Sequence, residues 1–254
     1  MLRRYLVGMQ SNVPISKLVE SSSIRVREID NRRRQIESTI GHLEPQIQEM
    51  KLGEAKKFKL AVLHIDINGF KKLVQGLSQE QYLRLVSSFL TEMTQIVDDL
   101  NGMIDRYVGD QVTALFGIDH KCEKCGPEDS LKCALNMMTV IKYCLNPYFE
   151  SIGLPPISCS IGIDFGDIWI AKVGIRGINQ LTLVGNAVNI AAQLVEIANN
   201  GHILLGENTY DAISHDDKKY CEERVSNSWN WIHLPSRTPY RFFWFRAQWP
   251  NYSL

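Results

Sequence analysis

Apolar and polar residues follow two different patterns along this chain. Up to about residue 57, scattered aliphatic residues lie among many Arg, Glu, Gln and Ser residues, and no segment has the pattern of a strand. From residue 58 onward, short apolar runs alternate with longer segments in which apolar residues recur at helical spacing. We therefore predict an N-terminal helical arm at residues 1–57 and one domain at residues 58–254.

The apolar residues of the arm follow a four-three spacing, which is typical of a helix that packs along one partner. They are Ile29, Ile36, Ile40, Leu43, Ile47 and Met50. Arg33 lies within this seam, Pro45 interrupts it, and the repeat is shorter than the roughly three to four heptads of a secure coiled coil. Two interpretations stay open: a short arm at a dimer interface, or a helix pair folded back on its own domain.

The domain begins with an apolar run, LAVLHIDI at 60–67, which predicts a buried strand ending at an aspartate. Ser78 and Gln81 form a capping-box signature before a long amphipathic helix, which Asn101 and Gly102 end. The later predicted elements are a hairpin (103–108 and 111–117), a helix (129–145, ending before Pro147), a strand pair (157–166 and 168–174) and a helix (185–201). This order predicts an α+β domain with one mainly antiparallel sheet covered by helices.

Composition and charge narrow the class of protein. The 254 residues are 44% hydrophobic and 22% charged, which is ordinary for a globular protein. Lys plus Arg total 28 and Asp plus Glu total 28, so no overall field favours a nucleic acid or an anionic membrane. No signal peptide or apolar run of membrane-spanning length is visible. We expect a cytoplasmic protein that binds neither nucleic acid nor membrane.

Two aspartates are the first candidates for chemistry. Asp66 and Asp110 each lie where a predicted strand gives way to a turn. Carboxylates at adjacent strand ends can share two Mg²⁺ ions, which keep several waters and bind substrate phosphates. One ion would lower the pKa of an attacking hydroxyl, and the other would neutralise the leaving phosphates. The alternative is that Asp66 caps a turn and Asp110 only forms one.

Four segments resemble, in order and spacing, the motifs of class III adenylyl and guanylyl cyclases. They are HIDINGF (64–70), DRYVGDQVTALFG (105–117), SIGIDFGDI (160–168) and LVGNAVNIAAQL (183–194). The resemblance covers about residues 58–215. It implies a ferredoxin-like cyclase homology domain that uses two divalent cations, Mg²⁺ or Mn²⁺. It also implies a homodimer, arranged head to tail, with composite sites for a nucleoside triphosphate at the interface.

The resemblance assigns roles to individual positions. The metal-binding positions match Asp66, Asp110 and the carbonyl of Ile67. The turn whose amides meet the triphosphate matches Asn68, Gly69 and Phe70. Asn189 matches the asparagine that orients the ribose and the reacting phosphate across the dimer interface.

The chain departs from the adenylyl cyclases at the base-reading positions. Arg106 replaces their lysine, and Thr182 stands where mammalian enzymes have an aspartate and many bacterial ones a threonine. Arginine is a rigid fork of donors with no acceptor, so it suits the carbonyl-rich edge of a pyrimidine better than adenine. The alternative is that Arg106 only forms an ion pair with Asp105 or another nearby carboxylate.

A second departure is Gln193, which stands where the family has an arginine that stabilises charge on the transferred phosphoryl group. Either another cation substitutes, or activity is low. The candidate cations are Arg237, Arg241, Lys172 and Arg176. Among them, Arg237 is nearest by rough alignment to the family's C-terminal phosphate-binding lysine.

A small cyclase domain behind a short arm, with arginine at the base-reading position, resembles the pyrimidine cyclases of the bacterial Pycsar anti-phage system. This implies synthesis of cyclic UMP or cyclic CMP, which would act on a separate effector. We place UTP ahead of CTP because its O4 adds an acceptor. The alternatives are an adenylate cyclase and a catalytically weak pseudo-cyclase.

Weaker signals have ordinary explanations. His120, Cys122, Cys125 and Cys133 could bind zinc, but the fourth ligand would have to reach back from a helix, which favours reduced cysteines. The irregular spacing of the six cysteines also fits reduced thiols better than a disulfide framework. His64 lies in an apolar strand, where a satisfied core histidine is expected. The aromatic segment 240–249 predicts a C-terminal strand rather than a nucleic-acid platform.

Overall fold

A computed structural model describes residues 15–31, 47, 49–118, 125–198, 201–234 and 236–246. Its centre is an eight-stranded sheet with the order β2-β3-β1-β4-β6-β8-β7, in which β5 also pairs with β4. The strands are β1 (Ala55–Ile67), β2 (Met103–Val108), β3 (Gln111–Phe116), β4 (Cys159–Ile175), β5 (Ile178–Val184), β6 (Ile203–Gly206), β7 (Cys221–Arg224) and β8 (Phe242–Phe245). All pairs are antiparallel except β4 with β6, as the predicted α+β class requires.

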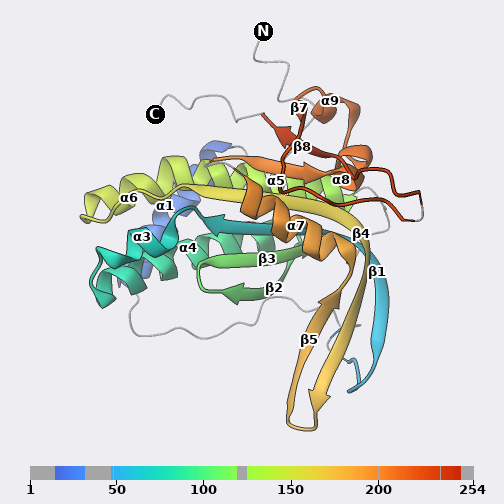
Figure 1. The fold of residues 1–254 in the computed structure, drawn as a ribbon. Helices are drawn as coiled ribbons and strands as arrows, with labels where there is room; N and C mark the ends of the chain where they lie inside the picture. Colours follow the sequence, from blue (N-terminus) through green and yellow to red (C-terminus); the bar gives the residue numbers. More distant parts are fainter. Residues whose placement is uncertain are drawn as a thin grey trace.

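Helices cover the two faces of this sheet unequally (Figure 1). The helices are α1 (Ile15–Asn31), α3 (Phe70–Gln75), α4 (Gln79–Asp99), α5 (Cys125–Val140), the π-helix η2 (Ile141–Leu145), α6 (Asn146–Ser151), α7 (Asn186–Ile197), α8 (Glu207–Ala212) and α9 (His215–Lys218). The larger apolar core contains Leu63 and Ile65 of β1 together with α1, α4 and α5. The opposite face carries Leu60 and Val62 of β1 under α7. Alternate residues of β1 therefore point to different layers.

The predicted first half of the domain is confirmed. Ser78 and Gln81 form both hydrogen bonds of the capping box at the start of α4. The helix ends at Asp99, and Asn101 adopts a left-handed conformation with φ 55°. Strands β2 and β3 form the predicted hairpin with Asp110 in its turn.

Two predictions for the second half are wrong. Residues 157–174 are not a strand pair, because β4 runs without a break through Gly166, which pairs with Leu60 of β1. The hairpin partner of β4 is β5. The helix predicted to end before Pro147 also continues, since the amide of Asn146 bonds to Ile141 in a π-turn and Pro147 lies in the first turn of α6. Proline is tolerated there because that amide needs no partner within the helix.

The described part of the N-terminal region folds onto the domain. Leu18, Val19 and Val26 of α1 are buried in the larger core. Arg25 forms an ion pair of 3.0 Å with Glu92 of α4, whose side chain is fully buried. Ile47 and Met50 are buried on the α7 face. The side chains of Ile29, Ile36, Ile40 and Leu43 lie outside the described residues, so an arm at a dimer interface stays a prediction.

The cysteines differ from the prediction at one position. Cys133, Cys144, Cys159 and Cys221 are free thiols, whereas Cys125 is disulfide-bonded. Irregular spacing along the sequence therefore does not exclude a disulfide bond. His120 and Cys122 lie outside the described residues, and no described group of three or more His, Cys, Asp or Glu residues could hold a metal. No helix in the described part of the chain is long and apolar enough to cross a membrane.

Candidate active site

Asp66 and Asp110 meet at one end of the sheet. Asp66 is the penultimate residue of β1, and Asp110 lies in the turn that joins the neighbouring hairpin. The two carboxylates are in hydrogen-bonding contact, and the amide of Ile67 donates to Asp110 Oδ2 over 3.2 Å. Burial, followed by the Asp66 carboxylate, raises the pKa of Asp110 to about 7. Sequence placed both aspartates correctly at adjacent strand ends.

This pair fits divalent cations. Two half-buried carboxylates in contact repel each other when both are ionised, and positive charge between them removes that repulsion. Hard oxygen ligands of this kind suit Mg²⁺, which needs only one or two protein carboxylates. The carbonyl of Ile67 as a further ligand stays a prediction.

The turn after β1 has an open face toward solvent. Gly69 has φ 67°, in the left-handed region, and a Cβ added there would meet nothing within 4 Å. Gly69 precedes α3, so its neighbouring amides have no carbonyl partner within a helix. The ring of Phe70 turns away and packs near Tyr82, with centroids 5.7 Å apart. Backbone groups rather than side chains are thus available to phosphate oxygens.

Asn68 ties this turn to the adjacent strand β4. Its amide donates to the carbonyl of Ser158 over 2.8 Å, and its Oδ1 accepts from Ser160 Oγ over 2.8 Å. Its Nδ2 is buried and has no hydrogen-bond partner in the structure. A buried donor without an acceptor is costly, so Asn68 has capacity for a ligand oxygen.

Arg106 lies on β2 in the same cross-strand row as the residues beside Asp66. Arg106 pairs with Thr113, Thr113 pairs with His64, and His64 precedes Asp66 by two residues on the same face of β1. Arg106 is exposed, and its Nε bonds to Asp105 Oδ2 at 2.5 Å. Asp105 lies at a register shift in β2, and its side chain is only 5% exposed. The ion pair considered as an alternative therefore exists.

His64 is buried in the same row, but it is only partly satisfied. Its Nδ1 lies 2.9 Å from Thr113 Oγ1, whereas Nε2 has no partner in hydrogen-bonding geometry. Burial lowers the pKa of His64 to about 4, although the backbone of Val188 in α7 opposes this shift. The ring is therefore neutral and does not repel the Arg106 guanidinium at neutral pH.

The other predicted residues lie elsewhere in the chain. Asn189 is exposed on α7, whose opposite side packs on the sheet through Ala187, Ile190 and Ala191. Thr182 lies on β5 opposite Ala171, and its buried Oγ1 has no hydrogen-bond partner. No described hydrogen bond joins either residue to the aspartate pair or to Arg106.

Gln193 is held within its own chain. Its Nε2 donates to the carbonyl of Ser228 over 3.0 Å, and its Oε1 accepts from Trp231 Nε1. Two of the four candidate cations are also engaged: Lys172 donates to the carbonyl of Met50, and Arg241 pairs with Glu207. Arg237 is exposed, with φ 59°, and its amide bonds to the carbonyl of His233 over 2.7 Å. The structure does not join Arg237 to the aspartates.

Sequence reasoning missed Ser160, which holds Asn68, and the bond between His64 and Thr113. Asp105 was considered only as a partner of Arg106, and its burial was not predicted. Ser160 lies within a motif that was recognised, but its partner depends on the register between β1 and β4.

The arrangement defines a class of protein, a domain of the class III cyclase fold. The solved adenylyl cyclase CyaB from P. aeruginosa is 25% identical, with a TM-score of 0.66, and covers 79% of this chain and 100% of that chain. The family profile of the adenylate and guanylate cyclase catalytic domain matches residues 54–245. The chain belongs to this family.

The names of the chain's relatives differ in the nucleotide that is cyclised. The chain is 27% identical over 163 residues to an adenylate cyclase of Anabaena cylindrica, covering 61% of this chain and 30% of that protein. It is 32% identical over 154 residues to a cytidylate cyclase of Staphylococcus aureus, covering 58% of this chain and 35% of that protein. It is 27% identical over 167 residues to a uridylate cyclase of Burkholderia cepacia, covering 65% of this chain and 71% of that protein. The chain thus spans about a third of the first two relatives.

Proposed function

We propose that this chain is a pyrimidine nucleotide cyclase that converts UTP, or CTP, to the 3′,5′-cyclic monophosphate and pyrophosphate. The 3′ oxygen bonds to the α-phosphorus, the bond from that phosphorus to the bridging oxygen of the β-phosphate breaks, and the hydroxyl proton leaves to solvent. The observation that carries the proposal is the contact of Asp66 with Asp110 beside the cross-strand row that ends in Arg106.

Asp66 and Asp110 would hold two divalent cations, Mg²⁺ or Mn²⁺, with the carbonyl of Ile67. When bound, such ions acidify the attacking hydroxyl and neutralise the charge of the leaving pyrophosphate. The amides around Gly69 would receive phosphate oxygens, since nothing blocks their approach. The unpartnered Nδ2 of Asn68 would add a side-chain donor.

Arg106 would read the base. The Asp105 ion pair uses Nε, and no hydrogen bond to a described residue uses the terminal amino groups of Arg106. Asp105 would thus hold the guanidinium while its remaining donors meet pyrimidine carbonyl oxygens. Uracil offers O2 and O4, whereas cytosine offers only O2 as a carbonyl, so UTP is placed ahead of CTP. Thr182 Oγ1, also unpartnered, would take part in base binding.

A second copy of the chain would complete each site. Asn189 is exposed on α7, and no hydrogen bond among the described residues joins it to Asp66 or Asp110. The β4–β5 arm projects from the domain in Figure 1 and bears exposed apolar residues, among them Trp169, Ile175 and Ile178. Exposed apolar surface of this kind marks an interaction site. In the dimer, Asn189 and Arg237 would act on the partner's triphosphate.

Two alternatives have specific support. The Anabaena relative is named an adenylate cyclase, so Arg106 could do the work of the family's lysine. Gln193 stands where the family has an arginine, and its side chain is engaged in two hydrogen bonds within the domain. The absence of a positive charge from this side chain favours a pseudo-cyclase. The pair of contacting aspartates argues against the pseudo-cyclase. A role of the cyclic product in anti-phage defence, through a separate effector in the cytoplasm, belongs to the same proposal.

The test is to incubate the purified chain separately with UTP, CTP, ATP and GTP, with Mg²⁺ or Mn²⁺, and to resolve the products by chromatography. The Asp66→Ala variant is the matched control for contaminating activity. Cyclic UMP or cyclic CMP with equimolar pyrophosphate supports the proposal. Cyclic AMP as the main product replaces it with the first alternative, and no product from any nucleotide replaces it with the second.

A further inference from the structure

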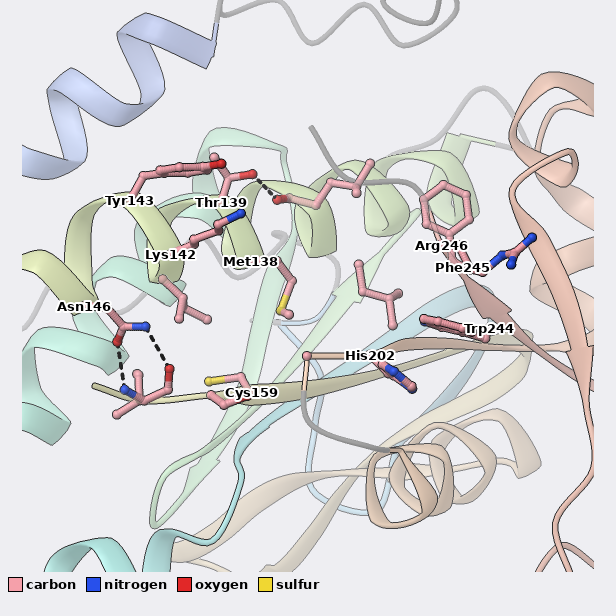
Figure 2. A pocket seen from close by; sticks show the side chains of 16 residues that line it. Met138, Thr139, Lys142, Tyr143, Asn146, Cys159, His202, Trp244, Phe245 and Arg246 are labelled. Carbon is pink, nitrogen blue, oxygen red and sulfur yellow. Dashed lines mark hydrogen bonds between the residues drawn. The ribbon is translucent and has the colours of Figure 1, made fainter. Parts of the chain in front are cut away.

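A cavity of about 400 Å³ lies on the face of the sheet that α5 covers (Figure 2). Ile65 and Ile67 of β1 point to this face, so Asp66 between them points to the opposite one. One wall is formed by the end of α5 and by η2, and the other by β6 and β8. The start of β4, with Cys159, lies between these walls. The volume is within the range of small-molecule sites, about 300–1,000 Å³. Nothing in the proposed reaction uses this cavity.

The charge of the lining favours an anion. Lys142 and Arg246 are among the sixteen residues drawn in Figure 2, and none of these residues is Asp or Glu. Arg246 already pairs with Glu222 over 2.9 Å. No described carboxylate pairs with Lys142, whose Nζ lies 4.9 Å from the centre of the Tyr143 ring. Lys142 has no carboxylate partner among the described residues, and Arg246 shares its charge with Glu222. The lining therefore suits a ligand with one negative charge better than a dianion.

The shape and polarity of the lining favour an aromatic ligand. The rings of His202 and Trp244 are stacked with centroids 4.2 Å apart and form one side of the cavity. Burial lowers the pKa of His202, which disfavours a positive charge on its ring. Met138 lies between the aromatic side and Lys142 in Figure 2, and Ile203 adds apolar surface to the lining. A flat apolar body with one charged end complements these surfaces.

Hydrogen bonds connect the wall of this cavity to the proposed phosphate-binding turn. Asn146 holds both backbone groups of Ile157, at 2.9 and 2.8 Å, as the dashed lines in Figure 2 indicate. The next carbonyl, of Ser158, accepts from the amide of Asn68. Ser160 then bonds to the side chain of Asn68. The adjoining wall is a π-helix, an uncommon element that is frequent at functional sites.

We propose that this cavity binds an aromatic monocarboxylate and that its occupancy changes nucleotide binding through Ser158 and Asn68. The binding step is independent of the proposed function. The coupling step rests on it, because it requires that the turn at Asn68 receive a triphosphate.

The first experiment measures binding by isothermal titration calorimetry on the full chain. The probe is indole-3-carboxylate, and indole-3-carboxamide is a neutral control of the same shape. We expect the carboxylate to bind at least about tenfold more tightly than the amide, because only the carboxylate can form an ion pair with Lys142. Lys142→Gln, at an exposed position, removes that difference. Lys219→Gln, an exposed lysine outside the cavity, and Asp66→Ala leave it unchanged.

Equal binding of acid and amide would overturn the anion site, and so would undiminished binding of the acid to Lys142→Gln. Absence of any binding of the probe would overturn it as well.

The second experiment measures coupling without turnover. The affinity of the probe is compared with and without saturating 3′-deoxy-UTP and Mg²⁺, since this nucleotide lacks the attacking hydroxyl. Linkage is reciprocal, so a probe that changes the affinity for the nucleotide has its own affinity changed by the nucleotide by the same factor. We expect this factor to be at least about twofold. An unchanged affinity, with nucleotide binding shown in a separate titration, would refute the coupling. Failure of the nucleotide to bind would instead contradict the proposed function.

Discussion

At the scale of single residues, Arg106 leads to a prediction about base recognition, and its ion pair with Asp105 determines which control the experiment needs. Arg106→Ala should lower kcat/KM for UTP by about tenfold to a hundredfold, the value of a hydrogen bond to a charged group. Residual activity on ATP should fall less, because adenine has no carbonyl oxygen. Steady-state kinetics with both nucleotides measures the ratio.

The single variant also leaves the nearly buried Asp105 carboxylate without its partner, which costs stability. The control is the double variant Arg106→Ala/Asp105→Asn, which removes that unpaired charge. It should recover thermal stability but not the preference for UTP. Recovery of the preference in the double variant would mean that Arg106 acts only as the partner of Asp105.

The contact between Asp66 and Asp110 leads to a second prediction. Asp66→Ala or Asp110→Ala should reduce turnover by about two orders of magnitude or more, since metal ions contribute several kcal/mol. Without metal, each variant should unfold at the same temperature as the wild type or higher, because one of two repelling carboxylates is gone. Differential scanning calorimetry and a product assay measure the two quantities. Wild-type turnover in either variant would remove the two-metal assignment.

Sequence could place the aspartates and the turn at Gly69, because each belongs to a local motif. It could not find the partners of Ser160 and His64, because strand register, a tertiary property, fixes both contacts. The pair of Asp105 with Arg106 is visible in the sequence, whereas the burial of Asp105 at a register shift in β2 is not. His64 illustrates the difference, since one ring nitrogen is bonded as expected for a core histidine and the other is not.

At the scale of elements, the position of α7 leads to a prediction about assembly. Asn189 lies on the exposed side of α7, so it should act on the partner's triphosphate. Asp66→Ala and Asn189→Ala should each be inactive alone. Mixed in equal amounts under subunit exchange, they should recover about a quarter of wild-type activity, because half of the dimers then have one intact site.

Exchange can be followed by native mass spectrometry of differently tagged chains. An inactive mixture in which heterodimers are present would show that Asn189 acts within its own chain or not at all.

The two elements that sequence predicted wrongly have a common cause. Gly166 and Pro147 are typical breakers, but both residues fit the element that continues through them. Gly166 is extended and paired within a sheet, and Pro147 lies where a helix lacks amide partners anyway. The structural context of these two residues therefore outweighed their local tendency to end a strand or a helix.

At the scale of the whole molecule, Asp164 links β4 to the segment before β8. Tyr240 donates to Asp164 Oδ1 over 2.8 Å, and burial raises the pKa of Asp164 to about 8, with Glu207 adding to the shift. Between about pH 4 and pH 8 the folded chain therefore holds a proton that the unfolded chain has lost. The free energy of unfolding should fall as pH rises through this window, by up to about 1.4 kcal/mol per pH unit.

Asp164→Asn keeps the acceptor for Tyr240 and removes the titration. Urea unfolding at pH 5 and pH 8 should then show a smaller loss of stability in the variant than in the wild type. The same loss in both proteins would assign the pH dependence to other groups.

The central claim, that the chain is a cyclase for pyrimidine nucleotides, is tested most directly by competition in one reaction. With UTP, CTP, ATP and GTP present at equal concentrations, the initial ratio of products equals the ratio of their kcat/KM values. The account predicts that cyclic UMP accumulates fastest, followed by cyclic CMP. A reaction in which cyclic AMP or cyclic GMP exceeds both pyrimidine products would contradict it.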